Sequence, residues 1–458
     1  METRTGLQKL AQFPFQLATW VDPDGYPVTA AVKATIDPAA GEAVFAMPAG
    51  LTVPVDREVS LTGSHIRPQP GIGYDERRHV TVWGRATLRG SEAVLTANRA
   101  WGWNEQETPF FEYSERNLEQ SRRYLGRISR EQGREVRPRL SLGWLTLRAT
   151  RLPFLTATFI PVLLGLTIAI RQGFFEPVSA ILTVVGAAFV HLALNVANDV
   201  FDTRSGADDA NVNPTQYSGG SRVIQYGLVS LRRMAGLSAA FYIVGGGIGL
   251  LLLALRGSPA LLAIGVIGLI LSLEYTAPPL KLVYRGLGEV TTALGFGPLM
   301  LVGAYVVQTA GVLTPEPFVA SIPVAILVAL ILYVNEIPDR RSDALAGKRT
   351  LPVRLPQSSV VRIYLLAAIA TFASVVLGVL AGVLPIPTLA ALLAIPLARQ
   401  VHAGIQQYYD QPYGLMAIMG VNVKLHLLVG GLLLVAYVAV IVLAAVLPQA
   451  PLYLPWAR

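Results

Sequence analysis

Two clusters of acidic and amide side chains stand where long apolar runs end. They are Asn195, Asn198, Asp199 and Asp202 in the first, and Asn335, Asp339 and Asp343 in the second. Residues three, four or seven apart share one face of a helix, so each cluster points its oxygens one way if the helix continues through it. Carboxylates crowded near hydrocarbon repel one another, and a hard divalent cation relieves that repulsion. The spacing predicts Mg²⁺, which takes one or two carboxylates and leaves its other positions to water and phosphate oxygens.

Basic residues follow these clusters along the chain. They are Arg222 after GGS, Lys281 and Arg285 within YTAPPLKLVYRGLGE, and Lys348 and Arg349 after Gly347. The glycines before Arg222 allow backbone N–H groups to approach an anion. Acids for a metal and bases for phosphate together predict a diphosphate bound as its magnesium complex. For each residue alone, the alternatives are a solvated helix cap, a positively charged cytoplasmic loop, or ion pairing between the clusters and nearby arginines.

The composition is typical of a membrane protein. Of 458 residues, 53% are hydrophobic and only 14% are charged, with a mean hydropathy of +0.49. The absence of cysteine excludes disulfides, zinc–thiolate sites, iron–sulfur clusters and cysteine nucleophiles. The chain has 37 Lys and Arg residues against 29 Asp and Glu. No nucleic-acid-binding module accompanies this excess, so we expect no nucleic acid partner, and instead a lipid bilayer and a phosphorylated substrate.

The chain divides into a soluble half and a membrane half, at residues 1–140 and 141–458. In the first, short runs rich in strand-forming residues alternate with turn signals such as Asp-Pro-Asp-Gly at 22–25. The runs are FQLATWV, PVTAAVKATI, AVFAM, EVSLTGSH and RRHVTVWGRATLRG. They predict a small, mainly β barrel or sandwich, followed by a polar helix over residues 114–132.

The second half predicts an all-α bundle of transmembrane helices, because apolar stretches of about 20 residues recur to the C-terminus. We expect nine spans, at 153–170, 178–199, 233–255, 258–275, 288–309, 316–337, 360–383, 386–404 and 425–447. Arginine and lysine concentrate before the first span and after spans two, four and six. The positive-inside rule therefore places the N-terminal domain and these loops in the cytoplasm, and the C-terminus on the opposite side, of a bacterial-type cytoplasmic membrane.

From about residue 150 to 448, the chain resembles the UbiA-type intramembrane prenyltransferases. The family pattern Asn-x-x-x-Asp-x-x-x-Asp begins at Asn198 and Asp202, but its third position is Gly206 and the acid follows at Asp208. This departure is similar to the 1,4-dihydroxy-2-naphthoate polyprenyltransferase branch of menaquinone synthesis, as are GGSRVIQYGLVS, YTAPPLKLVYRGLGE and DALAGKRTLPVRL. Chlorophyll-synthase-like and hydroxybenzoate-type members usually carry Asn-Arg-Pro where this chain has GGSR.

The resemblance implies nine helices around a cavity open to lipid, two Mg²⁺ ions, a polyprenyl diphosphate and an aromatic acceptor. One ion would be held by Asn198, Asp202 and Asp208, and the second by Asn335, Asp339 and Asp343. Arg222, Lys281, Arg285 and Lys348 would neutralise the leaving diphosphate. Tyr275 would stabilise the allylic cation through its ring face, with a role as a membrane-interface anchor as the alternative. Asp199 would orient the acceptor or act as its base. His191 and His426 are expected to be packed or hydrogen-bonded rather than catalytic.

Residues 15–130 resemble the split barrel of the pyridoxamine-phosphate-oxidase-like group. The resemblance rests on LATWVDPDGYPVTAAV and RRHVTVWGRATL. It implies FMN, a related flavin or haem at the interface of a dimer formed through the barrel, with Lys33, Thr62, Ser64 and Arg85 as candidates for contacting the cofactor. The alternative is a barrel without cofactor that assists assembly or partner docking.

Together these features predict Mg²⁺-dependent transfer of a polyprenyl group to an aromatic quinone precursor, with 1,4-dihydroxy-2-naphthoate as the expected acceptor. The alternatives are a prenyltransferase for another aromatic or a tetrapyrrole, a transporter that relays ions through intramembrane acids, and a regulatory protein whose membrane part is inactive. A relay needs acids near the middle of the membrane. Here the acids stand at helix ends beside basic residues, which favours the enzyme.

Overall fold

The computed structural model describes the chain except residues 23–25, 48, 49, 52–54, 56, 70–72, 109, 137–140, 212, 448, 450, 455, 457 and 458. The described residues form two compact units, Met1–Asn117 and Leu118–Arg458. The predicted domain boundary at residue 140 lies outside the described residues, as do residues 23–25 of the predicted turn.

The first unit is an antiparallel sheet of seven strands in the order β2-β1-β5-β6-β7-β4-β3. The strands are β1 (Gln16–Val21), β2 (Pro27–Val32), β3 (Ala34–Asp37), β4 (Glu42–Ala46), β5 (Glu58–Gln69), β6 (Gly73–Arg89) and β7 (Glu92–Asn104), with helices α1 (Thr3–Leu10) and α2 (Phe110–Arg116). Side chains on one face of the sheet, such as Leu61 of β5 and Val82 of β6, are fully buried in a cluster with Leu7 and Leu10 of α1. The polar faces of the same strands point the other way, as the period of two requires.

The sheet curls into a half-barrel. Strands β2 and β3 form its opposite edges although only Lys33 separates them in sequence, so the two edges must approach each other there. The Ala34 N–H of β3 donates a hydrogen bond of 2.9 Å to the Gln16 side chain of β1. The expectation of a small, mainly β barrel or sandwich is confirmed at the level of a β half-barrel. The prediction of one strand over PVTAAVKATI was wrong because the chain changes edges at Lys33, and β7 was not predicted.

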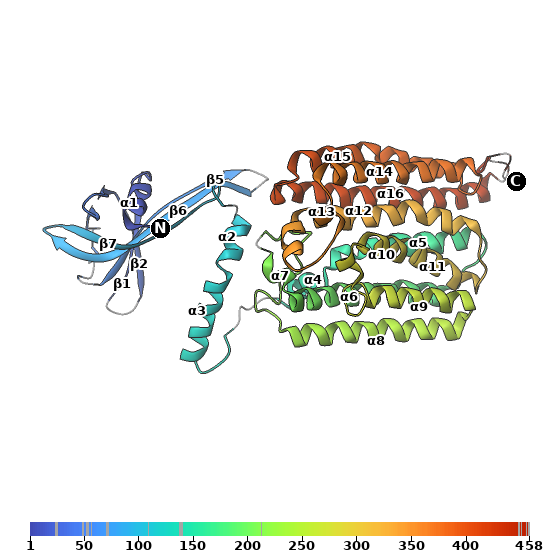
Figure 1. Cartoon of the computed structure of the whole chain (residues 1–458), viewed down its shortest axis with the longest axis horizontal. Helices are drawn as coiled ribbons and strands as arrows, with labels where there is room; N and C mark the ends of the chain where they lie inside the picture. Colours follow the sequence, from blue (N-terminus) through green and yellow to red (C-terminus); the bar gives the residue numbers. More distant parts are fainter. Residues whose placement is uncertain are drawn as a thin grey trace. The chain divides into compact units, whose positions relative to one another are not determined.

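The second unit is helical and carries the long apolar segments (Figure 1). Its elements are α3 (Leu118–Glu131), α4 (Leu142–Thr150), η1 (Leu152–Leu155), α5 (Thr156–Arg171), α6 (Pro177–Ser205), α7 (Ala207–Ala210), α8 (Leu231–Arg256), α9 (Pro259–Leu273), η2 (Leu282–Arg285), α10 (Gly288–Leu294), η3 (Gly295–Leu299), α11 (Met300–Thr309), α12 (Pro315–Leu345), α13 (Leu351–Arg354), α14 (Gln357–Leu380), η4 (Ile386–Ala394), α15 (Ile395–Tyr408) and α16 (Pro412–Val446).

Among the described residues, seven helices are long and apolar enough to cross a membrane, counting α10 to α11 and η4 to α15 as single spans. The other two predicted spans coincide with the shorter apolar helices α5 and α9, of 16 and 15 residues. The expectation of a helical membrane domain is therefore confirmed at the level of seven candidate spans.

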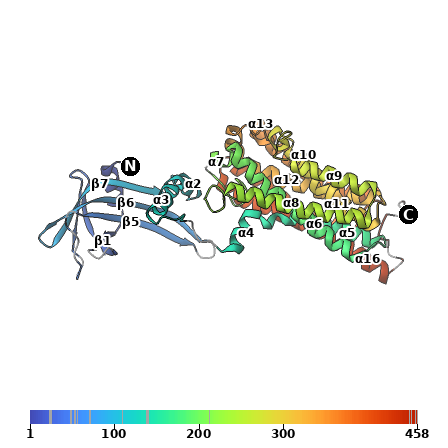
Figure 2. The same cartoon turned by 90° about the horizontal axis from the view of Figure 1, so that it is seen from below.

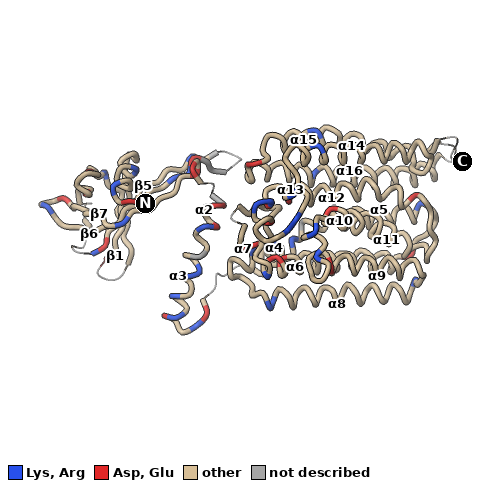
Figure 3. The backbone as a smooth tube through the Cα atoms, viewed as in Figure 1, with Lys and Arg blue, Asp and Glu red and all other residues tan. Residues whose placement is uncertain are grey.

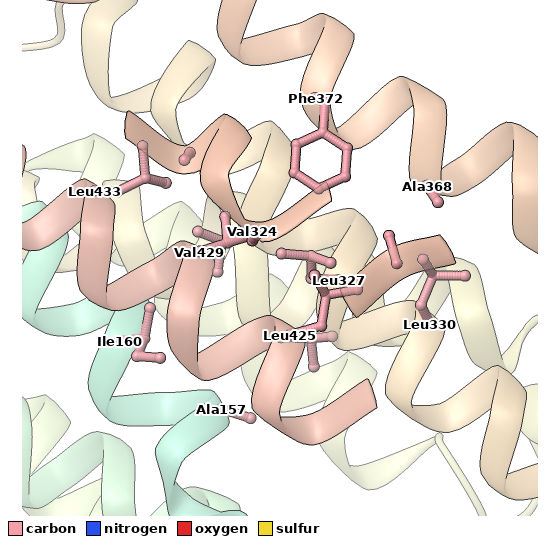
Figure 4. Close-up of a cluster of buried hydrophobic side chains, with 14 of the residues drawn as sticks. Ala157, Ile160, Val324, Leu327, Leu330, Ala368, Phe372, Leu425, Val429 and Leu433 are labelled. Carbon is pink, nitrogen blue, oxygen red and sulfur yellow. The ribbon is translucent and has the colours of Figure 1, made fainter. Parts of the chain in front are cut away.

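Helices in this unit pack through apolar and small residues. Val324 and Leu327 of α12 meet Leu425 and Val429 of α16, and Phe372 of α14 belongs to the same cluster (Figure 4). Helices α6 and α8 lie side by side along much of their length in both views (Figures 1 and 2). In lipid, where burial of apolar surface gives little driving force between helices, close backbone approach at small residues supplies much of the packing energy.

Gly165 marks one such approach, and its replacement tests it. A methyl group there would lie 2.2 Å from the Leu301 carbonyl oxygen of α11, and backbone cannot move aside cheaply. We expect Gly165→Ala to lower the free energy of unfolding by about 1–3 kcal/mol through overpacking. Gly236→Ala in α8 is the control, because the same methyl group meets no atom within 4 Å. Thermal unfolding in detergent measures both, and equal melting temperatures would contradict the prediction.

Candidate active site

The first acidic cluster lies on the last turns of α6, which continues to Ser205 and so keeps Asn198 and Asp202 on one helix. Asp202 is 4% exposed and accepts three hydrogen bonds. Its Oδ2 accepts from Asn198 Nδ2 at 3.1 Å and from Lys348 Nζ at 2.8 Å, and its Oδ1 accepts from the Tyr284 hydroxyl at 2.8 Å. Asp202 is therefore the point at which three separate segments of the chain meet.

Gly206 explains why the third acid of this motif is displaced. It ends α6 with φ of +81°, in the left-handed region that favours glycine, so the chain turns there and an acid at this position would leave the helix face. The turn starts α7 and buries Asp208 at 4% exposure. Burial and the nearby carboxylates of Asp202 and Asp199 raise the pKa of Asp208 above its ordinary value. Its Oδ2 has no hydrogen-bond partner among the described residues, so one buried oxygen remains available for a cation.

The second acidic cluster lies on α12, which extends to Leu345 as the spacing of Asn335, Asp339 and Asp343 required. Asp339 accepts hydrogen bonds from Asn211 Nδ2 at 2.9 Å and from the Gly219 N–H at 2.8 Å. The loop after α7 is thereby fixed to α12, which brings the two halves of the candidate site together.

Lys348 stands between the two clusters. Its ammonium group lies 2.8 Å from Asp202 Oδ2 and 3.7 Å from Asp343 Oδ1. Burial lowers the pKa of Lys348, but the two carboxylates outweigh burial and hold it above its ordinary value. The lysine is therefore a buried positive charge placed between two acids that come from different helices.

The GGS segment joins the clusters through its backbone. Gly219 and Gly220 both have φ of +76°, and the following Ser221 N–H lies 3.2 Å from Asp199 Oδ2. Asp199 also pairs with Arg151, which lies in the cavity wall, whereas Asp199 is outside that wall. We expected backbone N–H groups of this segment to face an anion, and in this structure two of them face Asp339 and Asp199.

The acidic clusters border a polar cavity that continues into an apolar one. Asn198, Asp202, Asp208, Asn335, Asp339, Asp343 and Lys348 all line the polar cavity. The apolar cavity is lined mostly by α6, α8, α9, η3 and α11. Tyr275, Thr292 and Phe296 line both, so they form the junction. The charged residues of this unit gather mainly near the end that carries α4, α7 and α13 (Figure 3).

The remaining predicted basic residues surround the site without lining the polar cavity. Arg222 is buried and donates to the Asp208 carbonyl oxygen. Lys281 Nζ lies 5.4 Å from the centre of the Tyr284 ring. Arg285 is exposed and donates to the Pro279 carbonyl oxygen at 3.3 Å, and Arg349 is exposed as well. Their contact with a diphosphate stays a prediction.

Four residues of the site were not singled out from the sequence. They are Arg151, Asn211, Tyr284 and Glu336. Tyr284 lies within the segment YTAPPLKLVYRGLGE, and Glu336 stands next to Asn335. The signal for Asn211 was its place in the polar stretch after Asp208, whereas nothing local distinguishes Arg151 from the arginines that precede the first span. His191, expected to be packed, bonds Thr158 Oγ1 through Nδ1 at 2.6 Å and also lines both cavities.

The donor sets fit Mg²⁺ chemically. No group of three His, Cys, Asp or Glu side chains with the geometry of a metal site occurs in the part of the chain that the structure describes. Each predicted set contains only two carboxylates and one amide, and Mg²⁺ usually completes such a set with water and phosphate oxygens. The unpartnered Oδ2 of Asp208 is the observation in this structure that supports the fit.

In the first unit, the candidates for a cofactor are spread over the outer side of the sheet. Lys33, Ser64 and Arg85 are exposed, and Thr62 bonds Thr81 through their hydroxyls at 3.0 Å. The same face carries an aromatic cluster in which Tyr113 stacks on Trp103 with ring centres 4.7 Å apart. These contacts pack α2 on the sheet and do not identify a ligand.

The chain has relatives among named enzymes and solved structures. Residues 158–417 match the profile of the UbiA prenyltransferase family. The chain is 28% identical over 300 residues to 2-carboxy-1,4-naphthoquinone phytyltransferase of Synechocystis sp., covering 64% of this chain and 92% of the relative. It is 31% identical over 224 residues to 1,4-dihydroxy-2-naphthoate octaprenyltransferase of Mycobacterium tuberculosis, covering 48% and 71%. A UbiA homologue of Archaeoglobus fulgidus solved with DMAPP and Mg²⁺ has a TM-score of 0.46 at 15% identity, covering 65% and 99%.

Proposed function

Because the chain belongs to the UbiA prenyltransferase family, we propose that it transfers a polyprenyl group from its diphosphate to 1,4-dihydroxy-2-naphthoate. One observation carries the proposal: a polar cavity with two acidic clusters and Lys348 continues into an apolar cavity. A diphosphate head and an isoprenoid tail need these two environments side by side. The names of the relatives support a naphthoate acceptor over other aromatics or a tetrapyrrole. The clustering of charge near one end of the helices disfavours an ion relay.

The same residues define where the metal would bind. Asn198, Asp202 and Asp208 would hold one Mg²⁺, and Asn335, Asp339 and Asp343 the second. When bound, Mg²⁺ neutralises charge that develops on the leaving diphosphate. Lys348 lies between both sets and would bind the same anion directly, with Arg222, Lys281, Arg285 and Arg349 in the surrounding loops.

Residues that line the two cavities would act on each step of the reaction. The allylic C–O bond breaks and its electron pair leaves with the diphosphate oxygen, beside Lys348. Tyr275 stands at the junction, where its ring can stabilise the allylic cation that remains in the apolar cavity. A ring carbon of the acceptor forms the new C–C bond, and the ring regains aromaticity by losing the proton from that carbon or, where that carbon carries the carboxylate, by releasing CO2. Asp199 does not line the polar cavity, but it pairs with Arg151, which does. We infer that Asp199 orients the acceptor through that arginine.

We also propose the finer features of the membrane arrangement and of the first unit. The short helices α5 and α9 cross the bilayer with the seven longer ones, giving nine spans. The site loops and the N-terminal unit face the cytoplasm of a bacterial-type membrane, and the C-terminus faces the other side.

The half-barrel binds a flavin such as FMN and forms a dimer. An absorbance scan of purified protein tests the flavin, and light scattering tests the dimer.

The activity is tested with purified protein, a long-chain prenyl diphosphate, 1,4-dihydroxy-2-naphthoate and Mg²⁺. We expect a prenylated naphthol with release of diphosphate, abolished by EDTA and restored by added Mg²⁺. Parallel reactions with hydroxybenzoate and with a chlorophyllide test the other branches. Formation of no product with any acceptor, beside an active relative assayed in parallel, would overturn the proposal.

A further inference from the structure

Glu336 is a buried acid without a role in the contacts described above. It lies on α12, is 6% exposed and lines the polar cavity. Neither of its carboxyl oxygens accepts a hydrogen bond from the backbone or from a donor side chain of the described residues other than the neighbouring carboxyl group of Glu289. A buried carboxyl group that lacks such donors costs free energy, so a fold that keeps one usually presents it to something that binds.

The neighbours of Glu336 place it at the junction of the two cavities. Its carboxyl group pairs with that of Glu289 on α10 through a side-chain hydrogen bond, and it also lies near Tyr275. Tyr275 and Thr292 line both cavities, and Thr292 stands one turn after Glu289 on α10. Glu336 therefore lies between the place for a diphosphate and the place for an isoprenoid tail.

Glu289 differs from Glu336 in having a backbone partner as well. Its carboxyl group accepts a hydrogen bond from the backbone of Leu351, the first residue of α13. A carboxyl group that accepts from the first turn of a helix satisfies one of its free N–H groups, and this contact ties α13 to α10. Glu336, which has no backbone partner and lines the polar cavity, is thus the better placed of the two to meet a ligand.

We propose that Glu336 positions the aromatic acceptor by accepting a hydrogen bond from one of its ring hydroxyl groups. This inference rests on the proposed function. The reacting ring carbon must lie at the junction, because the allylic carbon joins the diphosphate to the tail there. A naphthoate offers two kinds of polar group, hydroxyl donors and a carboxylate. The paired carboxyl groups of Glu336 and Glu289 offer acceptor oxygens to a hydroxyl donor and no positive charge to a carboxylate, so Glu336 fixes which edge of the ring faces α12.

A metal ligand is the competing role for Glu336, because it stands next to Asn335 and three residues before Asp339. The two roles predict changes in different kinetic parameters. A hydroxyl contact changes the KM for the acceptor alone, whereas a metal ligand changes the Mg²⁺ concentration needed for half-maximal activity and the KM for the prenyl diphosphate.

The test compares Glu336→Leu and Glu336→Gln with the wild type. We expect the leucine variant to raise the acceptor KM about tenfold, the loss that follows when one partner of a buried hydrogen bond is removed and the other is left unsatisfied. The glutamine variant, whose amide oxygen still accepts, should recover most of that loss. The KM for prenyl diphosphate and the Mg²⁺ dependence should not change. Glu274→Gln is the control, since Glu274 lines neither cavity.

Acceptor analogues make the test independent of the folding of the variants. Naphthoates that lack one hydroxyl group or the other are assayed with wild-type protein, and removal of the contacting hydroxyl should raise the KM as much as Glu336→Leu does. For that analogue, the leucine variant should show no further loss. An unchanged acceptor KM in Glu336→Leu, a shifted Mg²⁺ dependence, or no wild-type response to either analogue would overturn the proposal. Failure of wild-type protein to prenylate any naphthoate would instead overturn the proposed function.

Discussion

Replacing Asp202 by asparagine lowers the rate of prenyl transfer by about a hundredfold to a thousandfold, the range found when one electrostatic contact to a transition state is removed. The change keeps the shape of the side chain but removes its charge. Asp202 accepts from Asn198, Tyr284 and Lys348 at once, so the loss reaches all three contacts as well as the predicted metal site.

Initial rates at saturating and at limiting Mg²⁺ measure this effect. We expect the Mg²⁺ requirement to rise along with the loss of rate, because the variant set retains a single carboxylate at Asp208. Asp209→Asn is the matched control, since Asp209 is exposed and lies outside the cavity wall. A rate within threefold of the wild type in Asp202→Asn would refute the assignment of Asp202.

Lys348→Met combines a loss of activity with a loss of stability. The methionine removes the positive charge that lies 2.8 Å from Asp202 and 3.7 Å from Asp343, and leaves two buried carboxylates facing one another. Removing one partner of a buried ion pair typically costs about 3–5 kcal/mol. We expect an unfolding temperature clearly below that of the wild type, and a rate lowered by about a hundredfold to a thousandfold.

Added Mg²⁺ separates the two causes. Because a divalent cation can take the place of the missing ammonium group between the acids, Mg²⁺ should raise the unfolding temperature of Lys348→Met more than that of the wild type, while the rate stays low. Arg341→Met is the control, because Arg341 is exposed and its pair with Asp410 is a surface contact worth little. Equal stabilisation of Lys348→Met and wild type by Mg²⁺ would contradict the proposed position of the lysine.

The sequence by itself determined the membrane class, the place of most helices, the mainly β character of the first unit and the two acidic motifs. These features are local. Apolar length predicts a span, a period of two predicts a strand, and spacings of three, four and seven put Asn335, Asp339 and Asp343 on one face of a helix. The sequence also shows that Gly206 replaces the third acid of the motif and that the next acid is Asp208. The structure adds that the left-handed backbone of Gly206 ends the helix.

Only the tertiary structure decided which partner each charged group has. Lys348 and Asp202 are 146 residues apart, and Asn211 and Asp339 are 128 apart, so their contacts depend on how α6, α12 and the loops pack. The same holds for the change of sheet edge at Lys33 and for the pairing of Glu336 with Glu289. The type of a side chain is a property of the sequence, whereas its partner is set by packing between segments far apart in the chain.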